Sequence, residues 1–197
     1  MRAAPLTRSA LAAALLASTS SASEPPRPNL VVIDGLAGVW SVSTKDGGES
    51  RDTGLVVGST TATSRTDHPL RLGYHRALGS LTLGGGLHYG TSAGLSSQLV
   101  AAPRVGAWIG GGSLAIWPRA GVTYGRSTID IGRESDTADE LMLAAELLFV
   151  APLAPHVGLS FGPGVELGVS GSHDSYGQTH EVRSRVIGAQ LGLVADF

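Results

Sequence analysis

Residues 187–197 read IGAQLGLVADF, and residues 157–170 read VGLSFGPGVELGVS. An apolar residue recurs at almost every second position of both stretches, as at Leu191, Leu193 and Phe197. Successive side chains of a strand point to opposite faces, so each stretch predicts a strand with one apolar face. The other face holds mostly glycine and serine with isolated charges. Such a face is typical of a narrow barrel interior whose apolar exterior meets lipid.

Six further stretches bring the number of predicted strands to eight. Five of them alternate in the same way, over residues 69–77, 79–90, 98–109, 113–127 and 141–151. The first strand falls within residues 30–44, where residues 31–33 break the period. The strands are near the roughly 9–11 residues that a tilted membrane strand requires. Because proline removes a ladder N–H, we predict local bulges at Pro103, Pro118 and Pro163.

The connections between the predicted strands alternate in length. Short turns are predicted at Leu78 and at residues 110–112 and 152–155, and longer polar segments at residues 45–67, 91–97, 130–139 and 171–182. Short periplasmic turns and longer outer loops give this order. The apolar patch at residues 54–58 leaves a ninth strand open, but an even count places both termini on one side. The sequence thus predicts an all-β, closed antiparallel up-and-down transmembrane β-barrel of about eight strands.

The N-terminus has the layout of a secretory signal peptide. Arg2 and Arg8 precede an apolar run over residues 10–17, and small residues follow over residues 18–23. The apolar run is far shorter than the roughly 20 residues of a spanning helix. We therefore predict a signal peptide over residues 1–23, cleaved after Ala22 or Ser23, and one mature barrel domain over residues 24–197.

Composition narrows the function classes further. Only 15% of the 197 residues are charged, 28 are glycine and none is cysteine, whereas about a quarter of a typical globular domain is charged. The net charge of −2 and the lack of a basic stripe argue against nucleic-acid binding.

Four stretches between Pro69 and Phe197 carry a resemblance to known proteins: 102–106 (APRVG), 116–121 (IWPRAG) with Tyr124, 162–164 (GPG) and 188–197 (GAQLGLVADF). Through them the chain from Pro69 to Phe197 resembles a group of uncharacterised bacterial outer-membrane β-barrel proteins with a small eight-stranded, OmpA/OmpX-like architecture. The resemblance implies the fold and an outer-membrane location. It implies no chemistry, because members of the group have no established activity.

Five charged residues fall on the small-residue face by parity and are predicted to form an ion network in the lumen. They are Arg71, Arg104, Arg119, Glu146 and Glu166. A turn that pairs Leu114 with Ile109 would set Arg104 opposite Arg119. Two guanidinium groups repel each other, so we predict that Glu146 lies between them. A charge in a narrow interior must be paired, which favours a structural network, with a gated pore or ligand site as the alternative.

Three motifs suggest chemistry, and each is better explained by structure. Residues 158–162 (GLSFG) match a hydrolase nucleophile elbow, but the alternation runs on with no helix after it. His88 and Ser92 faintly resemble the catalytic pair of outer-membrane lipid A deacylases, although their spacing and strand position differ. His173, Asp174, His180 and Glu181 cluster without regular metal-ligand spacing.

Trp108 and Trp117 point inward by parity and are predicted to fill the core.

The sequence therefore favours an outer-membrane barrel of structural or surface-interaction type, with no enzymatic activity, cofactor or metal. The alternatives are a lipid-modifying enzyme and a soluble lipocalin-like barrel, which would keep an apolar interior and a charged exterior. We expect a monomer in the cell outer membrane, with outer-membrane lipid and the barrel-assembly machinery as partners and no nucleic acid. Leu191, Leu193 and Phe197 are the predicted insertion signal for that machinery.

Overall fold

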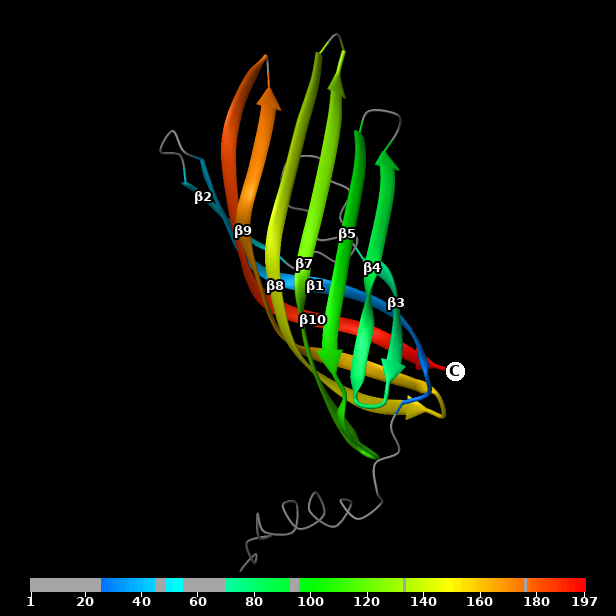
Figure 1. Ribbon diagram of the computed structural model, residues 1–197. Coiled ribbons are helices and arrows are strands. Elements are labelled where there is room, and N and C mark those ends of the chain that lie inside the picture. The colour runs from blue at the N-terminus through cyan, green and yellow to red at the C-terminus, as the bar shows by residue number, and fades with distance from the viewer. Residues whose placement is uncertain (1–25, 45–48, 55–69, 93–95, 133, 176) are drawn as a thin grey trace, which may run out of the picture.

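The computed structural model describes residues 26–44, 49–54, 70–92, 96–132, 134–175 and 177–197, which form a sheet of ten antiparallel strands (Figure 1). The strands are β1 (Asn29–Thr44), β2 (Glu49–Gly54), β3 (Arg71–Leu78), β4 (Leu81–Ser92), β5 (Ser96–Ala107), β6 (Ile109–Gly111), β7 (Leu114–Ile131), β8 (Glu134–Ala154), β9 (Val157–Ser175) and β10 (Gln178–Asp196). The predicted signal peptide lies outside the described residues.

Eight of these strands close into a ring. Hydrogen bonds join β1, β3, β4, β5, β7, β8, β9 and β10 in this order, and β10 pairs with β1 again. β6 continues the line of β5 beyond Trp108 and keeps its register with β7. The predicted closed, eight-stranded up-and-down barrel is therefore confirmed.

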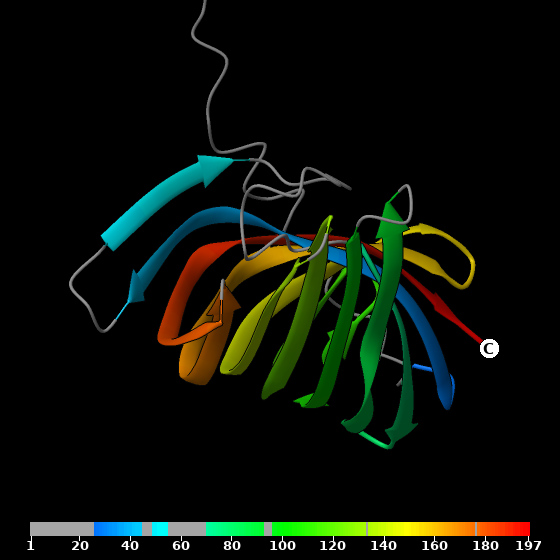
Figure 2. The same cartoon turned by 90° about the horizontal axis from the view of Figure 1, so that it is seen from above.

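The ring closes along β1. Its full length pairs with β10, from Leu30 opposite Asp196 to Thr44 opposite Val182. Only the lower part of β1, up to Asp34, pairs with β3, while its upper part pairs with β2. β2 therefore lies beside β1 and outside the ring (Figure 2). Most of the apolar patch at residues 54–58 lies outside the described residues, and only Gly54 is seen, at the end of β2.

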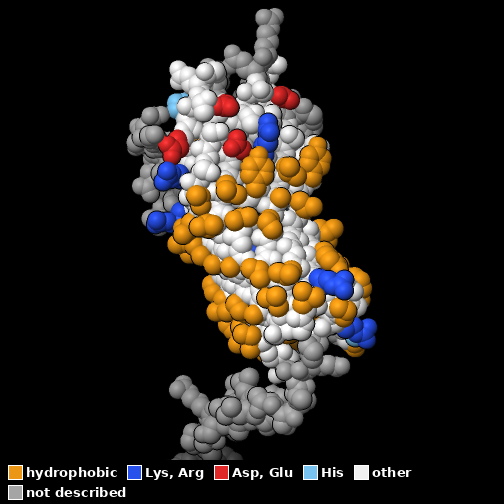
Figure 3. All heavy atoms as spheres, in the orientation of Figure 1, with side chains coloured by type: hydrophobic (Ala, Val, Ile, Leu, Met, Phe, Trp, Pro, Cys, Tyr) orange, Lys and Arg blue, Asp and Glu red, His pale blue; other side chains and the backbone are white. Residues whose placement is uncertain are grey.

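The exterior is apolar and the interior polar. Large apolar side chains are exposed on every strand of the ring, with Tyr89 71% and Leu143 55% accessible. Figure 3 shows them as a broad band around the visible face, with charged side chains mainly gathered beyond one edge. Leu167 and Leu193 face outward as the alternation predicted, whereas Glu166 and Ser160 are buried. A lipocalin-like barrel requires the reverse distribution and is excluded.

An apolar plug fills the interior near the short turns. It consists of Leu30, Val32, Ala115, Trp117, Leu148, Val150 and Val194, with Trp108 packed against it. The Trp117 indole is fully buried and donates from Nε1 to Thr82 Oγ1 at 2.8 Å. Trp117 therefore fills the core as predicted, and Trp108 is half-buried against it.

Two predictions about the strands are wrong. Residues 130–139 and 171–182 were expected to be loops, but β7 and β8 meet within residues 131–134, and β9 and β10 within residues 175–178. β7 to β10 are 18 to 21 residues long, against 12 for β4 and β5. Beyond the lipid a strand needs no apolar face, so its polar composition resembles that of a loop.

The prolines do not cause bulges. The register between β5 and β7 is the same at Ala101–Tyr124 and at Arg104–Gly121, on either side of Pro103. The pairs on either side of Pro118 and of Pro163 are likewise in constant register. The shifts occur instead near Met142, Leu153 and Arg183. Pro103 has no N–H to donate to the neighbouring strand. The register sets the carbonyl of Val122 opposite Pro103, and this carbonyl accepts a hydrogen bond from Arg104 Nη1 instead.

Nowhere in the described ranges is there a helix with the length and apolarity needed to cross a membrane.

Glycine allows neighbouring strands to approach closely at Gly84. A Cβ atom there would clash with the carbonyl oxygen of Tyr74 and lie 2.5 Å from Cα of His75. We expect Gly84→Ala to lower the free energy of unfolding by about 1–3 kcal/mol, because backbone atoms must move apart. Urea unfolding in lipid vesicles measures the loss. Gly125→Ala is the matched control, since its Cβ would meet no atom within 4 Å. Equal stability of the two variants would contradict the close approach.

Candidate functional site

Six charged side chains from six strands meet inside the barrel. They are Asp34 on β1, Arg71 on β3, Arg104 on β5, Arg119 on β7, Glu146 on β8 and Glu166 on β9, and each is at most 6% exposed. The structure thus brings together all five of the residues predicted for the lumen, and adds Asp34. With three arginines and three carboxylates, the cluster is neutral when every group is ionised.

Glu146 lies at the centre of this cluster. Its Oε1 is 3.2 Å from Nε of Arg104 and 3.8 Å from Nη2 of Arg71, and its Oε2 is 2.6 Å from Nη2 of Arg119. Arg119 also donates from Nε to Oε2 at 2.7 Å, which makes that contact a two-pronged ion pair. One carboxylate therefore compensates parts of three guanidinium groups, in agreement with its expected place between Arg104 and Arg119.

The other two carboxylates complete the circuit. Asp34 accepts from Arg71 Nε at 3.2 Å and from Arg119 Nη2 at 2.8 Å. Glu166 Oε1 accepts from Arg104 Nη2 at 3.1 Å, from Arg71 Nη1 at 3.5 Å and from the Thr123 hydroxyl at 2.8 Å. The network thus joins strands that are not neighbours in the ring, such as β1 and β7, through the lumen.

The predicted register at the second short turn is wrong by two residues. The structure pairs Gly111 with Leu114 and sets Arg119 opposite Gly106, so Arg104 faces Gly121. Only Gly112 and Ser113 lie between β6 and β7, and both Gly110 and Gly112 have positive φ, of 84° and 71°. This two-residue turn is tighter than one that pairs Leu114 with Ile109. The offset separates the two arginines along the strands and leaves room for Glu146.

Asp34 is the one member of the cluster that the alternation of the sequence did not predict. Leu30, Val32 and Asp34 are buried, while Ile33 faces outward. Residues 31–33 did not show which face of β1 points inward. The interior is apolar at this end of the barrel, so both faces of the strand carry apolar residues. The predicted set did contain one signal. Its three arginines and two glutamates leave one positive charge over, and a buried charge must be paired, so a third carboxylate was to be expected.

The ion network is arranged to tie the strands together and leaves little room for a substrate. The cavity enclosed by Asp34, Arg71, Arg104, Arg119 and Glu146 measures about 10 Å³, near the least that can hold a single water molecule. Among the described residues no group of three or more histidine and acidic side chains could hold a metal ion.

The other motifs are placed as follows. Ser160 of the GLSFG motif is fully buried near the start of β9, and the strand continues after it with no turn or helix. The His88 ring lies 3.0 Å from the carbonyl oxygen of Leu70, and the side chain of Ser92 is outside the described residues. His173 pairs across the hairpin with His180 and contacts Asp136 through Nε2. Leu191, Leu193 and Phe197 are all exposed on the outer face of the last strand and the chain end.

Comparison with known proteins identifies the fold. No protein-family model matches the sequence, and no curated protein matches it. Neisserial surface protein A is a similar solved structure, with 12% identity over 88% of this chain and 100% of that chain and a TM-score of 0.51. The N-terminal β-barrel domain of Pseudomonas aeruginosa OprF is another, with 7% identity over 87% and 99% and a TM-score of 0.50. The chain thus has the fold of the small eight-stranded outer-membrane β-barrels.

Proposed function

We propose that the protein is an outer-membrane β-barrel of structural or surface-interaction type. The observation that carries the proposal is the inverted distribution of side chains, with a continuous apolar exterior around a charged and filled interior. This distribution is stable only where lipid surrounds the wall. The strands β7 to β10 continue into residues 130–139 and 171–182, and we call these strand ends the β7–β10 extension. The barrel then holds this extension and the outer connections at the cell surface, where they contact partners.

The interior supports a non-conducting role. Side chains fill an eight-stranded barrel, and here the ion network and the apolar plug lie one above the other in the lumen. A general diffusion pore requires a continuous aqueous path, which both layers obstruct.

We also propose that the protein has no catalytic activity. The buried position of Ser160 and the contact of His88 with a backbone carbonyl support this proposal. Among the described residues Ser160 Oγ has no hydrogen-bond partner, so no oriented base stands beside it.

The proposal also includes how the barrel is inserted into the membrane. Leu191, Leu193 and Phe197 form an apolar stripe that the barrel-assembly machinery recognises, after removal of a signal peptide over residues 1–23. At the short-turn end of the barrel β1 pairs with both β10 and β3, so no strand edge is left free there. A second copy has no edge to pair with at this end, which supports a monomer.

The orientation of the barrel in the membrane gives the sharpest test of the proposal. Because the chain contains no cysteine, a single introduced cysteine can be labelled without background. We expect Thr179→Cys, in the exposed β9–β10 hairpin, to react with a membrane-impermeant maleimide on intact cells. Ser80→Cys, in the exposed short turn between β3 and β4, is the matched control and should react only after the outer membrane is permeabilised. Labelling is read from the purified protein by mass spectrometry.

Two outcomes would contradict the proposal. Labelling of Ser80→Cys alone on intact cells would reverse the orientation. Recovery of the protein in a detergent-free soluble fraction, without a heat-dependent shift in gel migration, would remove it from the membrane.

A further inference from the structure

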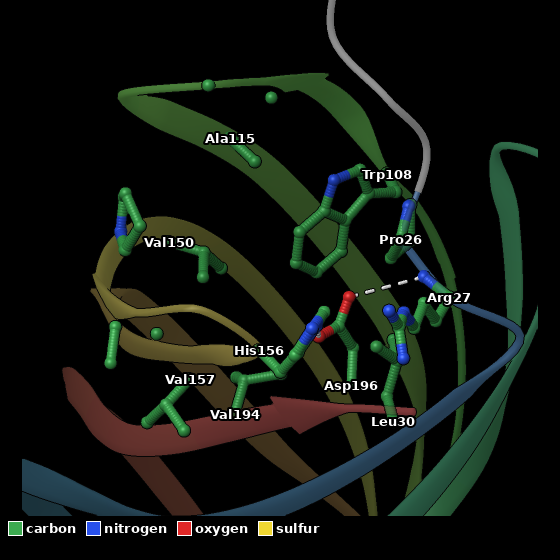
Figure 4. Close-up of a pocket in the computed structure, with 15 residues that line it drawn as sticks. Pro26, Arg27, Leu30, Trp108, Ala115, Val150, His156, Val157, Val194 and Asp196 are labelled. Atoms are coloured by element: carbon green, nitrogen blue, oxygen red, sulfur yellow. Dashed lines mark hydrogen bonds and ion pairs between the residues drawn. The ribbon is translucent and has the colours of Figure 1, made fainter.

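A second cavity lies at the short-turn end of the barrel, away from the ion network. Its volume is about 280 Å³. Its floor is the outer surface of the apolar plug, formed by Leu30, Ala115, Val150 and Val194. Figure 4 shows the Trp108 ring along one side, with the turn that carries His156 on the other.

Three polar side chains lie at the mouth of this cavity. Asp196 Oδ1 contacts His156 Nδ1 at 3.0 Å, and Asp196 Oδ2 accepts from the backbone N–H of Arg27 at 3.3 Å. Both oxygens of Asp196 are therefore engaged. Within the described chain no hydrogen bond or ion pair engages the Arg27 guanidinium, which lies at the same mouth (Figure 4).

The backbone at His156 is strained. Its φ of 68° makes it the one non-glycine residue with positive φ among the described positions. Asp196 holds this turn in place twice, by the contact with the ring and by donating its N–H to the His156 carbonyl at 3.0 Å. Strain that the surroundings hold in place is found more often at ligand sites than elsewhere.

The cavity has the dimensions and composition of a small-molecule site. A dry cavity of about 150 Å³ accommodates benzene, so this one has room for an aromatic ring with a short side chain. An apolar floor with a few polar groups at one edge is the usual construction of ligand sites. The unengaged cation at the mouth favours an anionic group on the ligand.

We propose that this cavity binds a small amphiphilic carboxylate, with its aromatic or short aliphatic part on the plug and its carboxylate at Arg27. The site faces the side opposite to the β7–β10 extension. It is therefore separate from any contact that the outer hairpins make, and it goes beyond the proposed surface role.

The probe is 3-(4-fluorophenyl)propionate, titrated against the protein in phosphatidylcholine nanodiscs and observed by ¹⁹F NMR. Nanodiscs replace detergent because detergent molecules are themselves amphiphiles, and empty nanodiscs give the lipid background. We expect saturable binding, with a Kd about tenfold higher for Arg27→Gln and for the neutral amide of the probe. Arg76→Gln is the matched control, since Arg76 is exposed near the same end but does not line the cavity.

Two filled variants test the location. Ala115→Leu fills the floor and should abolish binding, and Ala154→Phe narrows the mouth at an exposed position and keeps the test valid if Ala115→Leu fails to fold. Folding is checked by heat-dependent gel migration. Saturable binding that is lost in a filled variant and weakened by Arg27→Gln supports the site. Absence of saturable binding, or binding that survives filling or Arg27→Gln unchanged, overturns it.

Discussion

Replacement of Glu146 by alanine is expected to lower the free energy of unfolding by about 3–5 kcal/mol, because it leaves three buried guanidinium groups with two carboxylates. Asp34 and Glu166 reach only two of the arginines each, so neither replaces the central carboxylate. The loss is measured as a shift of the urea midpoint in lipid vesicles, followed by tryptophan fluorescence.

Two further variants separate charge from packing. Asp130→Ala removes an exposed carboxylate and should leave the midpoint nearly unchanged. Combining Glu146→Leu with Arg119→Met removes one charge of each sign and should recover much of the lost stability, because an apolar pair often replaces a buried ion pair without cost. An unchanged midpoint for Glu146→Ala would count against the network as a structural tie.

A charge on the exterior should have a comparable effect. Leu143 on β8 is 55% exposed within the apolar band, between Val122 of β7 and Leu167 of β9. We expect Leu143→Arg to cost about 2–4 kcal/mol in a bilayer, because the guanidinium enters hydrocarbon. The same urea titration measures it.

Ser135→Arg is the matched control for this substitution. Ser135 lies on the same strand with the same parity, eight positions toward the hairpin, and is exposed outside the apolar band. Its replacement should change stability little. Equal costs at the two positions would mean that β8 does not cross the bilayer at Leu143.

The period of two decided most of what the sequence could reveal. Once Leu143 and Leu147 are assigned to the exterior, Glu146 must face inward, and the same rule places Arg104 and Arg119. Parity is thus sufficient to gather the charges in one lumen. It is insufficient to rank their contacts, because the register depends on turn conformation, here the two positive φ angles at Gly110 and Gly112.

Where both faces of a strand have the same character, the rule fails. Asp34 was missed because β1 passes the apolar plug, and the ends of β7 to β10 were missed because both faces there are polar. The cavity at the short turns joins Arg27, just before the first strand, and Asp196, at the end of the last strand, with the turn at His156. No spacing along the sequence indicates that meeting, since closure of the ring creates it.

A nitroxide scan of β8 shows directly which face of the barrel wall meets lipid. The absence of native cysteine allows a single spin label at each position from Leu141 to Val150 in lipid vesicles. Oxygen dissolves in the bilayer core, so we expect high oxygen collision rates at odd-numbered positions such as Leu143 and Leu147, and low rates at even-numbered ones such as Ala144 and Leu148. High rates at the even positions, with the odd ones shielded or water-exposed, would contradict this expectation.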